Sequence, residues 1–468
     1  MAMAMSPNSR RDTTTGDRRR RVLLFPLPYQ GHINPMFQLA GLLHSRGFAI
    51  TVFHTDFNAP DASRHPAFDF VPVPDGTPES NPAQVTAERI LELNRACEAP
   101  FRERLAALLE QENARDNVDV ACLVGDAHLL TLLEVARGLG VPTMVLRTTS
   151  AACFRCFLAY PMLHRMGYLP PQESKLYMPV KELTPLRVRD LYYSRTGDNE
   201  GVSKLLARAT EAVKNSSGLV INACDALEAT ELETIRDQLN IPLVLAVGPL
   251  HKLSSESTGS SLLNQDYGCI EWLETQPSGS VLYVSFGSLA SMGSREFLEV
   301  AWGLANSGLP FLWVVRPDVV VVVQGLDGPD FPNGFEAAVE GRGKVVRWAP
   351  QQQVLAHRAV GGFWTHCGWN STLESISEGV PMICRPCFAD QMMNARYVEE
   401  AWGVGFALEG ELERGKIVRA IRKLMKEREG DAMRERAKEL KNRMEDGFKI
   451  GGSSHNAIDK MASYLLSI

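Results

Sequence analysis

Several features are missing from the sequence, and each absence narrows the class of protein. No apolar run reaches the ~18 residues that a membrane-spanning helix needs. Basic residues are not in excess: the formal net charge is −6, whereas a nucleic-acid-binding protein usually presents a basic face. No G-x-G-x-x-G loop follows the first strand-like run, so a dinucleotide-dependent dehydrogenase is disfavoured. We therefore expect no membrane span and no nucleic-acid partner.

Residues 1–20 lack the apolar block of a secretory signal and are instead polar and rich in arginine. This composition predicts a disordered tail. The alternative is an organelle transit peptide, but the acidic residues Asp12 and Asp17 argue against it.

Cysteine is sparse. The nine cysteines are an odd number and follow no secretory signal, so we expect reduced thiols in a cytoplasmic protein. Two C-x-x-C pairs, Cys153/Cys156 and Cys384/Cys387, would suit zinc, but they lie far apart in the chain and among apolar residues. We predict neither a metal site nor a redox centre.

What the chain does contain is an alternation of short β-rich runs with longer helical patterns. The strand-like runs are 22–27, 49–54, 120–125, 143–146, 219–222, 281–286, 311–315, 344–347, 361–365 and 381–384. The helical stretches include 36–45, 87–111, 295–306 and 371–378. This alternation predicts an α/β fold with parallel sheets, in which ligands bind at the carboxyl ends of the strands.

Two stretches interrupt the alternation. Residues 247–261 are rich in Ser, Gly and Thr and predict a linker between two domains of similar size. The five valines at 319–323 stand among Gly, Asp and Pro, and they are either a short buried strand or an apolar loop.

The turn at 365–374, THCGWNSTLE, contains more polar and aromatic side chains than a strand-to-helix turn requires. Ser371 and Glu374 match the S/T-x-x-E capping box, so they could simply cap a helix. That interpretation leaves His366, Trp369 and Asn370 unexplained. A helix N-terminus offers free N–H groups and the positive end of a dipole, so the turn is also suited to an anion, above all a diphosphate.

A second turn, PYQGHINPM, follows the first strand-like run. We expect Asn34 to cap the next helix and Pro35 to open it, with His32 just before the cap. A histidine in a loop is often solvent-exposed and without a function, but this one lies at the carboxyl end of a strand, where a parallel sheet binds ligands. Asp126, after the run 120–125, either caps a helix or pairs with His32, holding its tautomer.

Residues 348–391 read WAPQQQVLAHRAVGGFWTHCGWNSTLESISEGVPMICRPCFADQ, and this resembles the donor-binding signature of plant family-1 UDP-sugar-dependent glycosyltransferases. The likeness extends to GHINPM, VLYVSFGS and the terminal GGSSHNAIDKMASYLL, and thus to nearly the whole chain. FPLPYQGHINPM and LRTTSAACF resemble the subgroup that includes benzoxazinoid, cytokinin and steviol glucosyltransferases.

The resemblance implies the GT-B fold, with two Rossmann-like domains facing across a cleft. On this plan the disordered tail covers 1–20, an acceptor-binding domain 21–247, a linker 248–265 and a UDP-sugar-binding domain 266–445. A terminal helix, 446–468, would return to the N-terminal domain, and the protein would be a monomer.

The resemblance also implies the donor contacts. Trp348 would stack on uracil, with the backbone of Ala349 pairing with its edge, and Gln351 and Glu374 would reach the ribose. The implied diphosphate contacts are Ser288, His366, Asn370 and Ser371. The implied sugar contacts are Trp369, Asp390 and Gln391. Gln391 favours glucose, because galactose-using members tend to carry histidine there.

The implied reaction is inverting transfer of glucose from UDP-glucose, a co-substrate, to a hydroxyl of a small plant metabolite, giving a β-glucoside without a metal. His32 would be the general base and Asp126 its orienting partner. The acceptor would be a phenolic, a hydroxamic acid, a hormone or a terpenoid. His128, Thr148 and Phe154 are candidates for its pocket, although each could equally be ordinary packing.

Two other functions compete with this one. A non-catalytic nucleotide-sugar-binding or metabolite-binding protein of the same fold would be expected to have lost His32 or Asp126, and both are present. A dehydrogenase on a similar sheet lacks its glycine fingerprint here.

Overall fold

The computed structural model of the protein describes residues 19–76, 86–115, 118–194, 197–254, 261–319 and 331–468. The tail predicted over 1–20 lies outside them, except that Arg19 and Arg20 already belong to the first strand. The valine run predicted over 319–323 also lies outside them, except for Val319, which is buried. None of the described helices combines the length and the apolar character that crossing a bilayer requires.

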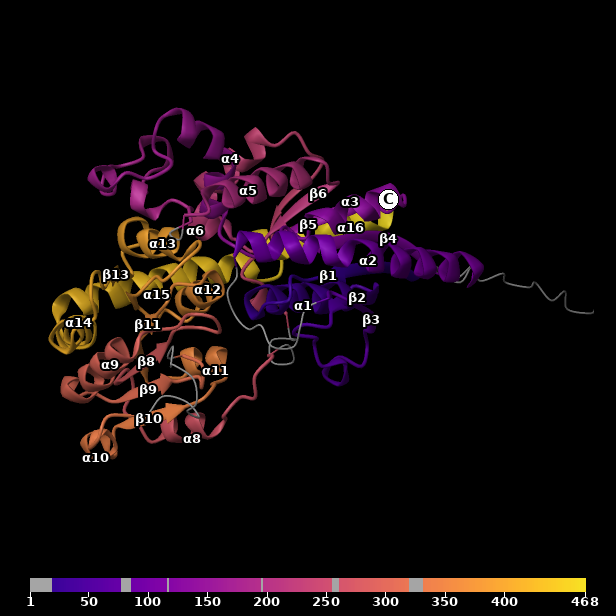
Figure 1. Cartoon of the computed structure of the whole chain (residues 1–468). Coiled ribbons are helices and arrows are strands. Elements are labelled where there is room, and N and C mark those ends of the chain that lie inside the picture. Colours follow the sequence, from indigo (N-terminus) through magenta and orange to yellow (C-terminus); the bar gives the residue numbers. More distant parts are fainter. Residues whose placement is uncertain (1–18, 77–85, 116–117, 195–196, 255–260, 320–330) are drawn as a thin grey trace, which may run out of the picture.

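Two parallel sheets, one in each half of the chain, form the framework (Figure 1). The first has the order β3-β2-β1-β4-β5-β6-β7 and the second β10-β9-β8-β11-β12-β13. The first sheet's strands are β1 (Arg19–Phe25), β2 (Ala49–Thr55), β3 (Asp69–Val73), β4 (Val118–Asp126), β5 (Thr143–Arg147), β6 (Gly218–Ile221) and β7 (Val244–Ala246). The second sheet's strands are β8 (Val281–Ser285), β9 (Phe311–Val314), β10 (Gly343–Val346), β11 (Val360–Thr365), β12 (Met382–Cys384) and β13 (Gly405–Ala407). The predicted α/β class and strand-like runs are confirmed.

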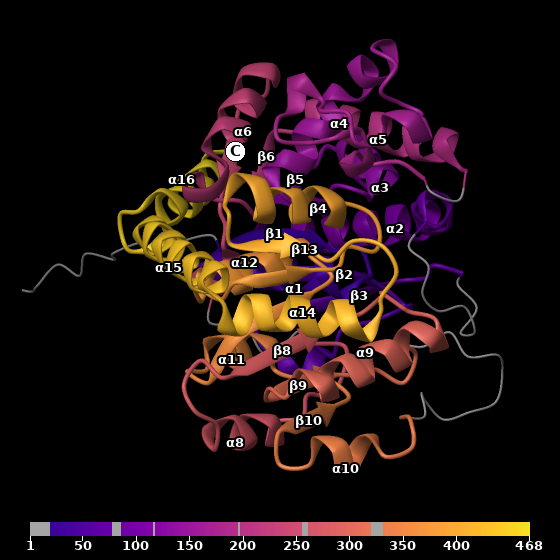
Figure 2. The ribbon, with the colours of Figure 1, turned by 90° about the vertical axis from the view of Figure 1, so that its left-hand side faces the viewer.

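Helices cover both faces of each sheet, which explains why strands such as β5 and β8 are buried along their whole length. The N-terminal half contains α1 (Gln30–His44), α2 (Ala87–Arg115), α3 (Leu130–Gly138), α4 (Ala151–Arg165), α5 (Asn199–Lys214) and α6 (Asp225–Gln238). The C-terminal half contains α8 (Gly268–Glu274), α9 (Ser294–Ser307), α10 (Phe335–Val339), α11 (Gln351–Ala356), α12 (Trp369–Ser377), α13 (Gln391–Arg396), α14 (Arg414–Lys426) and α15 (Arg428–Phe448). Figure 2 shows α9 and α14 adjacent on one face of the second sheet. Gly303 of α9 lies against Ile417 of α14.

The last helix, α16 (Ser453–Ser467), packs on the N-terminal half, against β4 and β7 of the first sheet. Ile458, Met461 and Leu465 are buried in one apolar cluster with Val22 and Leu24 of β1. The stretch predicted as a linker contains a short helix, α7 (Leu250–Leu253), whose Leu250 joins the same cluster. Apolar burial therefore anchors the terminal segment to the first sheet.

Strand order reverses between β1 and β4 in the first sheet and between β8 and β11 in the second. In open parallel sheets, such switch points leave a crevice at the carboxyl ends of the two strands. His32 and Asp126 follow or end the first pair of strands, while Ser288 and His366 follow the second pair. The topology thus places the turns PYQGHINPM and THCGWNSTLE each at a crevice of this kind.

Candidate active site

A cavity of about 520 Å³ lies between the two halves and is lined from both. Most of the predicted site residues line it. They are His32, His128, Thr148, Ser288, Trp348, Ala349, Gln351, His366, Trp369, Asn370, Ser371, Glu374, Asp390 and Gln391. Asp126 stands behind His32, and Phe154 is in the core of the N-terminal half. One cavity therefore unites residues from turns that are far apart in the sequence.

His32 and Asp126 form a pair in the N-terminal wall of this cavity, with Asp126 buried and His32 partly exposed. His32 Nδ1 lies 2.7 Å from Asp126 Oδ2, and the Thr148 hydroxyl is 3.0 Å from the same nitrogen. Burial alone would raise the pKa of Asp126, but the neighbouring imidazoles of His32 and His128 hold it well below its usual range. A carboxylate on Nδ1 fixes the tautomer that leaves Nε2 free to accept a proton.

His128 shares the same carboxylate. Its Nδ1 is 3.1 Å from Asp126 Oδ1, and its backbone N–H donates to that oxygen at 2.9 Å. Burial lowers the pKa of His128, so this ring is neutral at physiological pH. Among the described residues, His32, Asp126 and His128 are close enough to hold a metal ion, but hydrogen bonds already join both Nδ1 atoms to the carboxylate. The Asp126 carboxylate is therefore engaged by both imidazoles.

The prediction that Asp126 caps a helix is wrong, because α3 begins only at Leu130. The predicted cap at Asn34 is also wrong, because α1 begins at Gln30 and places His32 in its first turn. Pro35, inside the helix, has no N–H to offer the Gly31 carbonyl one turn earlier.

That free Gly31 carbonyl accepts a hydrogen bond from Asn370 Nδ2 at 2.9 Å, across the cavity. The amide oxygen of Asn370 lies 3.4 Å from Asn222 Nδ2, also in the N-terminal half. The Asn370 side chain thus joins the two domains.

The end of the cavity that was predicted to bind the diphosphate is the start of α12. The helix begins at Trp369, after Gly368, and no side chain caps it, so the predicted capping box of Ser371 and Glu374 is wrong. Both residues lie inside the helix, where the Ser371 hydroxyl accepts from Gln351 Nε2 at 2.9 Å. The N–H groups of the first turn have no helical partner and suit an anion.

His366 is clamped between two glycines beside this helix end. A Cβ at Gly287 or at Gly368 would lie 2.5 Å from its imidazole, and Gly287 has a φ of +73°, so both positions require glycine. Enclosure in the cavity wall and the nearby Arg316 guanidinium lower the pKa of His366 to about 4. The ring is therefore a neutral hydrogen-bond donor at physiological pH.

At the end of the cavity predicted to hold the nucleoside, neighbouring glutamines hydrogen-bond to Glu374. Both oxygens of the Glu374 carboxylate accept hydrogen bonds, from Gln351 at 2.7 Å and from Gln352 at 3.1 Å. Burial raises the pKa of Glu374. Trp348 is fixed by its indole N–H, which donates to the Ser261 hydroxyl at 3.2 Å. Gln352 was missed in the sequence analysis, although the QQQ run after Trp348 was a visible signal.

The sugar end differs in detail from what the sequence suggested. Gln391 Oε1 accepts the backbone N–H groups of Cys387 and Phe388 at 2.8 and 3.1 Å, so its amide faces the cavity as a donor only. The indole N–H of Trp369 donates to the Asn222 carbonyl at 2.7 Å and is not available to a sugar. Burial raises the pKa of Asp390, whose carboxylate accepts from Asn394.

The acceptor wall is aromatic. Phe154 does not line the cavity, whereas Phe157, one turn later on α4, does, together with Tyr192. Arg147 lies beneath them, fully buried, with its guanidinium carbon 5.0 and 4.6 Å from the ring centres of Phe154 and Phe157. Its Nε and Nη1 have no hydrogen-bond partner among the described residues. No sequence pattern pointed to this buried cation.

Known proteins resemble this chain over nearly its whole length. Residues 249–437 match the family model described as UDP-glucoronosyl and UDP-glucosyl transferase. UDP-glycosyltransferase 76B1 of Arabidopsis thaliana is 44% identical over 446 residues, covering 95% of this chain and 98% of the relative. The DIMBOA UDP-glucosyltransferase BX8 of Zea mays is 47% identical over 456 residues, again covering 95% and 98%.

Solved structures of plant glycosyltransferases have the same fold over nearly the whole chain. Phytolacca americana UGT2, complexed with UDP-2fluoro-glucose and pterostilbene, has a TM-score of 0.80 at 28% identity and covers 95% of this chain and 99% of its own. An indoxyl-glucosylating UDP-glucosyltransferase from Polygonum tinctorium has a TM-score of 0.81 at 29% identity, covering 97% and 100%. The expected GT-B fold and family resemblance are confirmed: this chain belongs to the plant UDP-sugar-dependent glycosyltransferases and is a UDP-glucose-dependent enzyme of that family.

Proposed function

We propose that the enzyme moves glucose from UDP-glucose to a hydroxyl of a small aromatic plant metabolite, with inversion at the anomeric carbon. The observation that carries this proposal is the His32–Asp126 pair in the cavity that also holds the donor residues. A base on one wall and an anion site on the other suit a single displacement between two bound substrates.

In this displacement His32 Nε2 takes the proton of the acceptor hydroxyl as its oxygen bonds to the anomeric carbon. The bond from that carbon to the diphosphate oxygen breaks on the opposite face, and UDP leaves with the electron pair. Asp126 stabilises the imidazolium that forms. The helix end at α12, with His366 as a donor, stabilises the departing charge, and the proposed reaction uses no metal.

A phenolic or hydroxamic acid acceptor fits this cavity best. Phe157 and Tyr192 offer aromatic faces, and their rings meet edge to face at 5.2 Å. The buried Arg147 cation beneath them favours an acceptor whose hydroxyl is acidic. The similarity to a DIMBOA glucosyltransferase supports the hydroxamic acid class.

We further propose that the enzyme works as a monomer in the cytoplasm. All nine cysteines are free thiols, and eight of them are buried, which suits a reducing compartment.

The test is release of UDP from UDP-glucose in the presence of a panel of phenolic, hydroxamic and terpenoid acceptors. We expect UDP release that depends on the acceptor and is fastest with the phenolic or hydroxamic compounds. Binding of UDP-glucose without acceptor-dependent release would instead support a non-catalytic binding protein.

A further inference from the structure

Helix α13 belongs to the C-terminal half by sequence but is docked on the acceptor half. Met393 and Tyr397 are buried in the core of the N-terminal half. The Ser150 hydroxyl donates to Asn394 Oδ1 at 3.2 Å, and the Tyr397 hydroxyl donates to the Glu231 carboxylate at 2.8 Å. Helix α13 and Tyr397, the residue that follows it, therefore both contact the N-terminal half.

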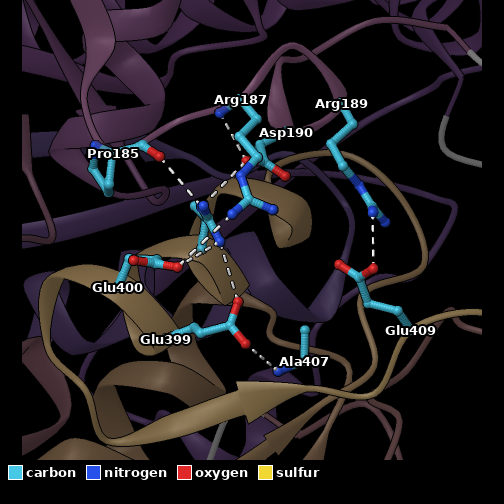
Figure 3. Close-up of polar contacts among 9 residues, drawn as sticks. Pro185, Arg187, Arg189, Asp190, Glu399, Glu400, Ala407 and Glu409 are labelled. Atoms are coloured by element: carbon cyan, nitrogen blue, oxygen red, sulfur yellow. Dashed lines mark hydrogen bonds and ion pairs between the residues drawn. The ribbon is translucent and has the colours of Figure 1, made fainter. Parts of the chain in front are cut away.

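An ion network joins the end of α13 and the segment after it to the loop 185–190 (Figure 3). We call it the interdomain ion cluster, and its members are Arg187, Arg189, Asp190, Arg396, Glu400 and Glu409. Asp190 belongs to a short 3₁₀ turn, η4 (Val188–Asp190). Figure 3 shows Arg189 reaching Glu409, and these side chains approach to 3.0 Å.

Arg396 is the centre of the cluster. Its Nε donates to the Pro185 carbonyl at 3.2 Å and lies 3.7 Å from Asp190 Oδ2. Its Nη1 is 3.0 Å from the Glu400 carboxylate. The side chains of Arg396 and Asp190 are each only 10% exposed, so this contact is screened less by solvent than the outer pair of Arg189 and Glu409, at 24% and 45%.

The cluster borders a cavity of about 220 Å³, yet it does not resemble an anion site. Each arginine already faces a carboxylate, including Arg385, which lies 3.0 Å from Glu296. The charges are nearly balanced and leave no surplus to attract a ligand. A connecting role explains the arrangement better.

The two segments that the cluster joins, α13 and the loop 185–190, each continue into residues that line the active-site cavity, on opposite walls. On one side, Asp390 and Gln391 precede and open α13, which Arg396 closes. On the other side, Tyr192 lies two residues beyond Asp190 and lines the acceptor wall. A shift of α13 against the loop would therefore change the spacing between the sugar end and the acceptor end.

We propose that Arg396 and the interdomain ion cluster are positioning residues, which fix the sugar-facing end of α13 against the acceptor wall. This inference rests on the proposed function, in which Asp390 and Gln391 face the donor sugar. UDP itself binds at α12 and the residues around Trp348, so its affinity does not depend on the cluster.

The first test is Arg396→Gln, assayed for transfer from UDP-glucose and for UDP affinity by calorimetry. We expect kcat to fall by roughly 10-fold to 100-fold, as for displacement of a reacting group by about 1 Å, while the Kd for UDP stays within about twofold. Arg396→Lys should recover part of the loss, because it keeps the charge but not the planar fork. Arg414→Gln is the matched control, since Arg414 pairs with Glu299 inside the C-terminal half.

A charge swap gives an independent test if Arg396→Gln melts below the assay temperature. Arg189→Glu and Glu409→Arg should each lower kcat by about two- to fivefold, the range expected for a partly exposed ion pair, and the double variant should recover it.

A wild-type enzyme with no acceptor-dependent turnover would overturn the proposed function together with this inference. A folded Arg396→Gln variant with the turnover of an active wild type would overturn the inference alone, and so would a swap without recovery or an equal loss of UDP affinity.

Discussion

His32 and Asp126 are separated by 94 residues in the chain, and β1 and β4 bring them together because these strands are neighbours in the first sheet. The sequence supported this pairing only as one of two options for Asp126. The contact at 2.7 Å and the full burial of the carboxylate explain why Asp126 pairs with His32. A buried charge persists when it is paired, and here its partner is the proposed base.

We predict that His32→Ala lowers turnover by ~10²-fold or more, because general base catalysis contributes on that order. UDP affinity should be nearly unchanged, since His32 stands in the half opposite the donor residues. Initial rates and calorimetry with UDP would measure the two effects. A variant with wild-type turnover would exclude His32 as the base.

Gln391 should determine the choice between UDP-glucose and UDP-galactose. Gln391 faces the cavity as a donor only, so it suits a sugar hydroxyl that accepts in one particular orientation. Inverting that hydroxyl leaves a buried donor unpaired, at a cost of about 1–3 kcal/mol. UDP-glucose should therefore exceed UDP-galactose by roughly tenfold to a hundredfold in kcat/KM.

Competition between the two donors would measure this ratio, and Gln391→His should narrow it. Equal use of both donors by the unmodified enzyme would refute the role of Gln391 in sugar recognition.

Among the elements, the turn from β11 into α12 is the proposed anion site. His366→Ala should weaken UDP binding by about 1.5–3 kcal/mol, the range for a hydrogen bond to a charged group. Calorimetry would test this, and an unchanged Kd would show that His366 serves the fold alone.

The same substitution should change how stability depends on pH. The folded state holds the pKa of His366 at about 4, below the ~6.5 of an unfolded histidine. The stability that neutral His366 contributes is therefore complete above pH ~6.5 and is lost as pH falls toward 4. Since the ring is partly accessible from the cavity, the loss at pH ~5 should be about 1 kcal/mol. Unfolding of both proteins at several pH values should show a smaller loss of stability at acid pH for His366→Ala.

The elements themselves were largely predictable, because apolar runs and strand–helix alternation report burial and parallel sheets directly. Helix starts were not. Local cap patterns placed the starts of α1 and α12 late, at Asn34 and Ser371, whereas Gln30 and Trp369 begin them. At α1 the helix can begin before Pro35 because the Gly31 carbonyl, which Pro35 leaves without a helical partner, accepts from Asn370 across the cavity, and no local pattern shows that contact.

The two domains together explain what the sequence could not reveal. The Trp369 indole donates to Asn222, and the interdomain ion cluster joins α13 to the acceptor half, so donor residues are oriented by the opposite domain. Residue identity indicated which side chains belong to the site. Only the assembled cleft shows which of their atoms are already engaged and which remain for a substrate.

The central claim is a single displacement across this cleft, with the base on one wall and the leaving diphosphate on the other. Such a step inverts the anomeric carbon, so the α-linked glucose of UDP-glucose must become β-linked in the product. The direct measurement is the anomeric configuration, by NMR, of the glucoside made from UDP-glucose and a phenolic acceptor. We predict the β-glucoside, whereas an α-glucoside would contradict the account.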